Sequence, residues 1–421
     1  MLKKKVVDML QNVALATLTV TAVLLIARIP MLDGVIGGRV RDLLSSVEQT
    51  QRHTIDLADS VTAVHFAVTD DVSFGRYTKL NALTSGADFQ RAAPLLREAI
   101  GSAAVWEQVA ETQFRNSLSH AGVYIDLMTV LPVSVVAAWL GEEVERDDMI
   151  RAMALTTEEE TAGIYFLCED GMILRCASAL SSKAVCDVTG TFQPNGGCFA
   201  FETEYSGFAP YMVMVRTMDQ LAQVNASLPA GYSAFNLLTA LEFNPHTYAR
   251  YVESGGTEVV LQSPHVLRID ADGTVRYNNS GIVEDNLYRI SSTGEVPTVA
   301  EVLYSACLLA EVLSGGTDAS PMSLDTVEKS ENGWIISFCY RVDGVLVRLK
   351  DDRCALRIVV TEDTITEFNY YCRSYTATQE NSVLLPVSIA VALAVQNEGT
   401  GLSVVYVDGG TSMLGAHWLV E

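Results

Sequence analysis

The sequence predicts an α+β fold behind an N-terminal transmembrane helix. The first observation is a basic start, Lys3 to Lys5, followed by a largely apolar run from Met9 to Ala27. That run of about 19 residues is close to the roughly 20 that span a bilayer. The second is a series of short β-rich segments joined by glycine turns, and the third is a set of delimited apolar helices between them. Because the basic cluster precedes the run, we expect a cytoplasmic N-terminus with the bulk of the chain outside the cell membrane.

Two other interpretations of the N-terminal run stay open, a secretory signal peptide and a buried core helix. A signal peptide has a shorter apolar core and ends in a small-residue cleavage site. Ala27 to Pro30 provides no such site. A soluble core helix would show a polar face, which this run lacks. The threonines Thr17, Thr19 and Thr21 can bond back to the carbonyls of their own helix.

The net charge and the cysteine pattern exclude several classes of function. The 421 residues carry a formal net charge of −23, which repels nucleic acid and anionic lipid. The acidic cluster from Glu142 to Asp148 is predicted to be a solvated loop. Eight cysteines occur without a C-x-x-C pair, so neither a zinc ribbon nor a thioredoxin-like centre is indicated. We expect mostly free, buried thiols, and one disulfide within Cys168, Cys176, Cys186 and Cys198 is the alternative.

The first half of the chain is predicted to alternate helices and strands. A tether after Pro30 leads to a segment with helical spacing from Arg39 to about Val68, interpreted as a juxtamembrane helix. A hairpin is expected around Glu169-Asp170-Gly171, whose glycine can take a positive φ. The remaining elements are helices at 88–100, 105–118, 235–241 and from after Pro132 to Leu140, a strand at 123–128 that ends in Leu131-Pro132, and a short element at 211–215.

The second half is predicted to repeat a meander, a helix and a strand. Its clearest element is a helix beginning at Thr298, which forms a capping box with Glu301, and closed by Gly315. A second helix is expected from about Pro386 to Val395. The expected strands are 259–261, 266–269, 274–277, 333–340, 345–349, 356–360, 364–371 and 402–407.

These elements suggest four parts. Residues 1–28 form the cytoplasmic start and the anchor, and 29–245 form an N-terminal extracytoplasmic α+β domain that ends at Asn244-Pro245. Residues 246–318 and 319–421 form a middle and a C-terminal module, interpreted as two related modules of antiparallel sheet plus helix.

Catalytic and metal motifs are missing from the sequence. The six histidines are scattered, and there is no nucleophile elbow, Walker loop, dinucleotide fingerprint or H-E-x-x-H. The run from Asp270 to Gly273 resembles the start of a calcium-binding loop. The chain has Asn279 at the position where such a loop needs a bidentate glutamate. We therefore predict no cofactor and no metal; the missing motifs count against an enzyme without excluding one, and the prediction of no enzyme comes from the family resemblance described next. Phe368 and Tyr370 are expected to pack in a strand, and Trp418 is expected to dock the C-terminus.

Several diffuse features together resemble a known family. They are the basic start and anchor, the strand ending at Leu131-Pro132, Asn244-Pro245-His246-Thr247 with Arg250-Tyr251 and Gly256-Thr257, Leu267-Arg268-Ile269 with Gly273, Val275 and Tyr277, Gly333-Trp334 leading to Asp343-Gly344, and Trp418. In these positions the chain is similar to the YycH and YycI proteins of Gram-positive bacteria, which accompany the WalK (YycG) sensor kinase of cell-wall metabolism. Its size and layout are closer to YycH.

The resemblance implies a single-pass, extracytoplasmic regulator of a two-component sensor histidine kinase that acts by protein–protein contact. The implied partners are a WalK-like kinase, a sister YycI-like protein and the membrane. Ala14, Thr17 and Thr21 fall on one face of the anchor, where small residues allow close helix packing. They are the candidate contacts to the membrane helices of the kinase. The alternatives are an envelope ligand-binding protein, a cell-wall enzyme, or a structural scaffold.

Overall fold

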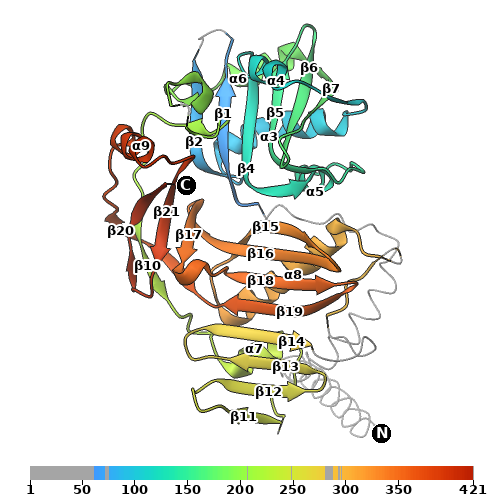
Figure 1. The fold of residues 1–421 in the computed structure, drawn as a ribbon, viewed down its shortest axis with the longest axis vertical. Helices are drawn as coiled ribbons and strands as arrows, with labels where there is room; N and C mark the ends of the chain where they lie inside the picture. Colours follow the sequence, from blue (N-terminus) through green and yellow to red (C-terminus); the bar gives the residue numbers. More distant parts are fainter. Residues whose placement is uncertain are drawn as a thin grey trace, which may run out of the picture. The chain divides into compact units, whose positions relative to one another are not determined.

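Two large β-sheets dominate the part of the chain that the structure describes (Figure 1). This computed structural model describes residues 61–420 apart from 72–74, 206, 248, 280–287, 293 and 295. The fold is α+β, as predicted, and is mostly strands in antiparallel sheets. The predicted anchor and its helix-contact residues Ala14, Thr17 and Thr21 lie outside the described residues.

The first sheet has seven strands in the order β2-β1-β4-β5-β6-β7-β3, and every pair is antiparallel. The predicted strand at 123–128 and the hairpin at Glu169 to Gly171 are both confirmed, and Gly171 has φ +84°. The strands are β1 (Ala63–Thr69), β2 (Arg76–Leu83), β3 (Trp106–Gln108), β4 (Gly122–Pro132), β5 (Met149–Thr157), β6 (Thr161–Cys168) and β7 (Ile173–Ser181).

Both faces of this sheet are covered, which explains why its strands are apolar at nearly every position. On one face, Phe66 and Ile125 pack in the same core as α3 (Ala87–Gly101), α5 (Val133–Leu140) and α6 (Ser182–Thr189). On the other face, Tyr124 and Tyr165 pack with α4 (Glu111–Ser117) and the segment of β8 (Cys198–Phe199), η2 (Ala200–Glu202) and β9 (Val213–Met214). The helices predicted at 88–100 and between Pro132 and Leu140 are confirmed.

Two helix predictions in this region are wrong. The segment predicted as helical up to Val68 is β1 from Ala63, because its apolar residues are buried alternately on the two sheet faces. Its earlier part lies outside the described residues. Within 105–118 only α4 is helical. Trp106 instead begins β3, which pairs with β7. The Trp106 ring stacks on the Phe166 ring at a centroid distance of 5.0 Å.

The second sheet has eleven strands and follows the order β11-β12-β13-β14-β19-β18-β16-β17-β21-β23, with β15 on the other side of β16. Only β17 and β21 pair in parallel among these strands. All eight strands predicted for the second half are confirmed. The bounds are β11 (Arg250–Val252), β12 (Glu258–Gln262), β13 (His265–Ile269), β14 (Thr274–Asn279), β15 (Met322–Ser330), β16 (Gly333–Val342), β17 (Val345–Leu349), β18 (Leu356–Thr361), β19 (Thr364–Tyr371), β21 (Leu402–Asp408) and β23 (Ala416–Val420), with η4 (Lys350–Asp352) after β17.

Helix α8 (Val299–Thr317) contacts β15, β16 and β18 of this sheet and also the short helix α7 (Ala234–Ala240). Its predicted capping box between Thr298 and Glu301 is confirmed. The predicted end at Gly315 is wrong, because the helix continues to Thr317 and ends at Asp318, which has φ +56°. The neighbouring glycine serves packing instead: a Cβ on Gly316 would lie 2.5 Å from Cβ of Ala240 in α7.

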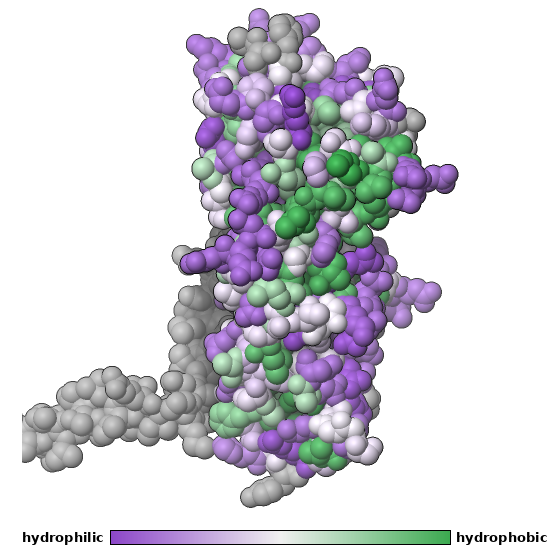
Figure 2. Space-filling view, turned by 90° about the vertical axis from the view of Figure 1, so that its left-hand side faces the viewer, coloured by the Kyte–Doolittle hydropathy of each residue, from purple (hydrophilic) through white to green (hydrophobic). Residues whose placement is uncertain are grey.

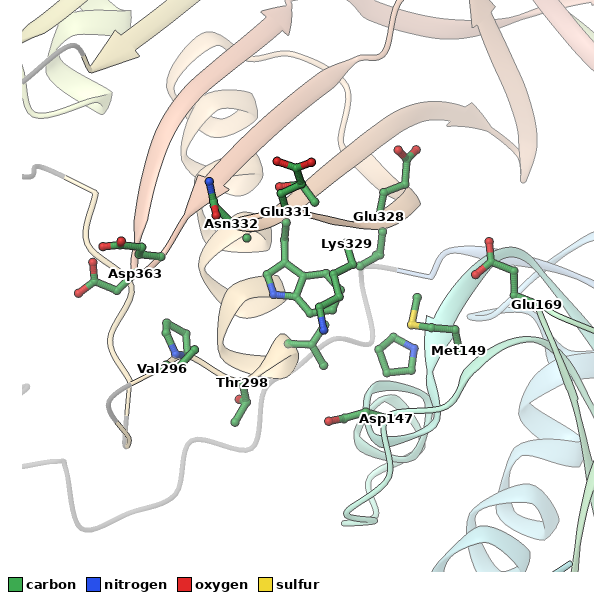
Figure 3. Close-up of a pocket in the computed structure, with 18 of the residues that line it drawn as sticks. Asp147, Met149, Glu169, Val296, Thr298, Glu328, Lys329, Glu331, Asn332 and Asp363 are labelled. Carbon is green, nitrogen blue, oxygen red and sulfur yellow. The ribbon is translucent and has the colours of Figure 1, made fainter.

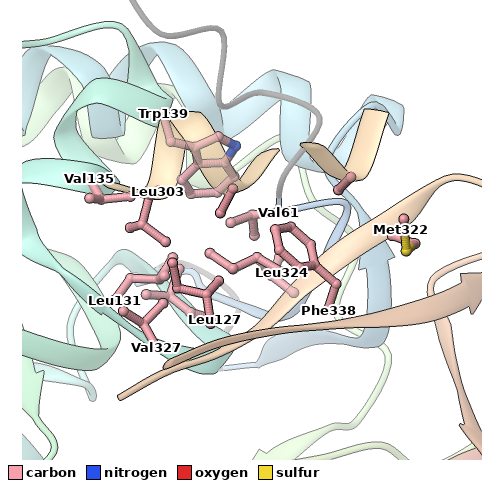
Figure 4. Packing of buried hydrophobic residues seen from close by; sticks show 14 of the residues in the cluster. Val61, Leu127, Leu131, Val135, Trp139, Leu303, Met322, Leu324, Val327 and Phe338 are labelled. Atoms are coloured by element: carbon pink, nitrogen blue, oxygen red, sulfur yellow. The ribbon is translucent and has the colours of Figure 1, made fainter. Parts of the chain in front are cut away.

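One cluster of buried apolar side chains connects the first sheet to the second. In Figure 4, Leu131 of β4 and Trp139 of α5 lie beside Leu303 of α8 and Leu324 of β15. Phe338 of β16 closes the cluster from the side of the second sheet. The described residues accordingly belong to one compact unit.

A small third sheet of order β20-β10-β22 joins distant parts of the chain: β10 (Ala222–Ser227), β20 (Ser374–Asn381) and β22 (Met413–Leu414). Together with the β14–β19 pairing, it means that the boundaries predicted at 245/246 and 318/319 do not coincide with breaks in strand pairing. Whether 246–318 and 319–421 are related modules stays a prediction.

One described helix, α8, is long and apolar enough to cross a membrane. It is the core helix of the second sheet, since Leu303, Ala306 and Leu313 are fully buried against their neighbours. Such burial is the ordinary state of an apolar helix in a globular domain.

Candidate functional site

The strongest candidate site is a surface on the last helix, α9 (Val387–Gln396), which the sequence predicted as a helix from about 386 to 395. Pro386 stands at its N-cap with φ −53° and ψ 142°, so the chain enters the helix without a side-chain cap. At the other end, Gly399 donates its backbone N–H to the Ala394 carbonyl at 2.9 Å. Glu398 takes φ +55° and reverses the chain there.

The inner side of α9 is lined by small residues. Ala390, Val391 and Ala394 are buried and form an apolar cluster with Phe208, Met214, Ala200 and Leu402. Small side chains at i and i+4 let the helix lie close to β21 and the β9 segment. One face of α9 therefore packs against the rest of the described chain.

The outer side of α9 is apolar as well. Leu385, Ile389 and Leu393 follow one another at four-residue spacing and are 49%, 48% and 41% exposed, and Val395 is 46% exposed. We call these four residues the α9 surface. No Asp, Glu, Lys or Arg occurs between Glu380 and Glu398. Figure 2 shows the side of the molecule on which α9 lies, with hydrophobic side chains gathered at that level.

Two features adjoin the α9 surface and fix its position. Trp418 of β23 donates its indole N–H to the Leu385 carbonyl at 2.8 Å, which ties the C-terminal strand to the start of the helix. This confirms the prediction that Trp418 docks the terminus. A cavity of about 360 Å³ lies beside Leu385, Pro386 and Val387, with Arg216 and Asp219 on its far wall. A hollow next to exposed aliphatic side chains is the shape in which an interface anchor fits.

The chemistry of this surface is burial, since α9 contains no titratable side chain. The four residues of the α9 surface are aliphatic and offer no group that could transfer a proton, attack a substrate or ligate a metal, while Ser388 of the same helix carries the one exposed hydroxyl. Exposed aliphatic residues that are contiguous and rimmed by polar groups, here Asn381 and Gln396 to Glu398, are typical of protein contact sites. The arrangement can hold a partner and orient it.

A second candidate is a polar crevice of about 480 Å³ where β4 meets β15 and β16. His65, Asp126, Arg151, Asp325 and Arg341 line it. Burial raises the pKa of Asp325 above the usual carboxyl value, although Arg341 nearby lowers it. Several of these groups already have structural roles. Asp126 accepts the Met128 N–H at 2.9 Å, His65 Nδ1 accepts the Asn81 N–H at 3.2 Å, and Arg341 donates to the Gly344 carbonyl at 3.3 Å.

The cysteines are unsuited to nucleophilic work. All eight are free thiols, as the sequence predicted, and none of the four between 168 and 198 is in a disulfide; only half of the eight are buried. Burial raises the pKa of Cys168 to about 11 and that of Cys339 to about 12, which keeps both protonated near neutral pH. Among the described residues no group of three or more His, Cys, Asp or Glu side chains is arranged to hold a metal.

The residues that carry the family resemblance are spread through the fold and have structural surroundings. Leu131-Pro132 ends β4, and Asn244 accepts the His246 N–H in a turn at 3.0 Å. Tyr277 is buried and bonds to His265 Nδ1 at 2.8 Å, and Gly273 has φ +98° in its turn. They do not converge on one site. The predicted contact residues Ala14, Thr17 and Thr21 are outside the described residues, so their proximity to any site stays a prediction.

No protein-family model matches the sequence, and a search of curated proteins finds no match. Among solved structures, the pyran synthase domain from module nine of the sorangicin pathway is 11% identical, over 56% of this chain and 73% of that domain, with a TM-score of 0.13. A likeness at this TM-score carries no argument about fold or activity.

Sequence reasoning predicted α9 as an element but missed it as a surface. The available signal was the uncharged stretch between Glu380 and Glu398, in a chain with 19% charged residues. A helix that is apolar all round is normally buried all round. Only the structure shows that one face of α9 stays exposed.

Proposed function

We propose that this protein is a membrane-anchored, extracytoplasmic regulator of a two-component sensor histidine kinase, of the YycH and YycI kind, and that it acts by protein–protein contact without catalysis. The observation that carries the proposal is the α9 surface: exposed Ile389 and Leu393 on a helix without a charge. The family resemblance supplies the identity of the partners. The run Met9–Ala27 supplies the anchor, with the bulk of the chain outside the membrane.

The two contact regions have different partners in this proposal. Ala14, Thr17 and Thr21 pack against the membrane helices of a WalK-like kinase through small residues. The α9 surface holds the sister YycI-like protein. Lipid is the less suitable occupant, because helices that lie in a membrane interface carry Lys and Arg on their polar face, and α9 has none. Binding the sister protein would fix the position of the anchor helix and so bias the two states of the kinase.

Site-specific photocrosslinking from intact membranes tests the outer contact. A photoreactive phenylalanine analogue replaces Ile389 in the full chain, and a matched variant carries it at Val105, which is 72% exposed and precedes β3 in the other large sheet. We expect an adduct with the YycI-like protein from position 389 and none from position 105. An adduct with lipid alone from position 389, or equal adducts from both positions, would contradict the proposal.

Co-purification tests the membrane contact separately. Replacing Thr17 and Thr21 by Leu enlarges two of the three small positions and should weaken co-purification of the kinase while leaving the α9 adduct intact. The same substitution at Thr19, which lies off this face, is the matched control. Unchanged kinase recovery from Thr17→Leu/Thr21→Leu would place the kinase contact in the outer domain instead.

A further inference from the structure

A second surface of the molecule has the properties of a peptide-binding site. A cavity of about 1240 Å³ lies between β15, the start of α8 and the loop before β5 (Figure 3). It exceeds the roughly 300 to 1,000 Å³ typical of small-molecule pockets. Pro132 and Met149 line its wall on the side of the first sheet, and Val327 to Trp334 line the side of the second.

One wall of this cavity is an open sheet edge. In the described part of the chain β15 pairs with β16 alone. The turn Glu331–Asn332 is two residues long, so Ser330 and Gly333 form the first hydrogen-bonded pair of the ladder. Glu328 then points its backbone groups toward Ile335, and the intervening residues point theirs outward.

The outward residues are Val327 and Lys329, both of which line the cavity. The register on the other side of β16 agrees with this assignment. Val342 and Val345 flank the two-residue turn of the next hairpin, which directs the even-numbered residues of β16 away from β15. Within the described residues no strand pairs with β15 at Val327 or Lys329, but Val327 is only 6% exposed and packs in the core, whereas Lys329 is exposed. β4 contacts β15 before this point, and Thr129 of β4 donates to the Asp325 carbonyl.

The charge around this edge is strongly negative. Six acidic side chains line the cavity, against Arg289 and Lys329: Asp147, Glu169, Glu328, Glu331, Glu362 and Asp363. Arg289 is occupied, since it donates to Asp363 at 2.6 Å. Lys329 lies above the ring of Trp334, with Nζ 5.9 Å from the ring centroid. The acidic side chains that line the cavity therefore outnumber the basic ones, and its net charge is negative.

We infer that β15 receives an extended basic peptide as an additional strand in this cavity. The backbone N–H and C=O groups of Lys329 supply the main-chain hydrogen bonds, which is the mode of β-strand addition. The carboxylates select lysine or arginine side chains, and Trp334 offers a flat surface for an apolar or cationic side chain. This peptide site is separate from the α9 surface and goes beyond the proposed function.

The probe is a fluorescently labelled heptapeptide in which lysine alternates with valine, added to the full-length protein and followed by fluorescence anisotropy. Lys329→Pro removes one outward N–H, and proline is tolerated at an edge strand because that N–H does not serve the ladder. Lys329→Val removes the same positive charge but keeps the N–H, so it is the matched control. Equal urea midpoints for the two variants establish that both are folded.

We expect saturable binding to the native protein, retained by Lys329→Val and weakened about tenfold in Lys329→Pro, the size of effect that one hydrogen bond produces. A heptapeptide N-methylated at alternate residues should not bind the native protein, and neither should the analogue with glutamate in place of lysine. The N-methylated peptide decides the question even if Lys329→Pro fails to fold. Equal binding of the methylated peptide, equal affinity of the two variants, or no saturable binding to native protein would overturn the inference.

Discussion

Helices α8 and α9 are alike in sequence and opposite in their surroundings. Both are rich in Val, Leu and Ala, and α9 has no charged residue. α8 lies against β15, β16, β18 and α7, and its apolar face is buried. α9 is seated by Ala390, Val391 and Ala394 and leaves Ile389 and Leu393 exposed. The apolar composition of a helix therefore predicts that it is buried. It does not predict whether other elements of the same chain cover both of its faces.

The largest expected effect separates the two helices by stability. Leu303→Ala in α8 removes a fully buried side chain and should lower the free energy of unfolding by about 2 to 5 kcal/mol. Leu393→Ala in α9 removes a side chain that is 41% exposed and should cost much less. Urea unfolding of both variants measures the difference. If Leu393→Ala is as destabilising as Leu303→Ala, α9 belongs to the core and the comparison fails.

The ends of the helices provide the next prediction. Thr298 accepts the Glu301 N–H in the capping box of α8, whereas α9 begins at Pro386 with no side-chain cap. Thr298→Ala should therefore lower the free energy of unfolding by about 1 kcal/mol. Thr298→Ser keeps the cap and is the control. Equal stability of the alanine and serine variants would show that packing alone fixes the start of α8.

These two helices also show what the sequence could predict. Caps, short turns and glycine at positive φ depend on neighbouring residues, so the α8 capping box and the hairpin at Gly171 were predicted correctly. Pairing is not local. No local pattern indicates that β10 lies between β20 and β22, and the apolar run of β1 fitted a helix as well as a strand.

The candidate site was less predictable than the fold for a related reason. Ile389 is exposed because no other segment of the described chain packs over it, and the residues near Ile389 in sequence do not reveal this. The end of α8 shows the same limit. A glycine is required at position 316 because Ala240 of α7 lies too close for a side chain there. Ala14, Thr17 and Thr21 stay predictions, because they lie outside the described residues.

A pH dependence is expected in the region that α8 covers. Asp325 lies in β15 next to this core, and burial raises its pKa in the folded protein. The folded state then binds more protons than the unfolded state just above the usual carboxyl pKa, so stability falls as pH rises through this window. Asp325→Asn should remove this dependence and stabilise the protein near neutral pH relative to pH 4.

The matched comparison for this pH effect is Glu158. Burial alone would raise its pKa, but hydrogen bonds from Arg175 and Tyr165 lower it below the usual value. Glu158 therefore contributes stability above the usual carboxyl pKa, and this contribution is lost as pH falls. Glu158→Gln should destabilise the protein near neutral pH, opposite in sign to Asp325→Asn. Urea midpoints measured from pH 4 to 8 test both, and equal signs would contradict the assignment.

The smallest expected change in stability is on the outer face of α9. Ile389→Lys with Leu393→Lys places two charges where the side chains already meet solvent, so the free energy of unfolding should change by no more than about 0.5 kcal/mol per site. The control pair is Val105→Lys, just before β3, with Val252→Lys, in β11; these positions are 72% and 67% exposed. Both pairs should leave the fold intact, but only the α9 pair should abolish the adduct with the YycI-like protein. Loss of the adduct in both pairs would mean that added charge, rather than the α9 surface, controls the contact.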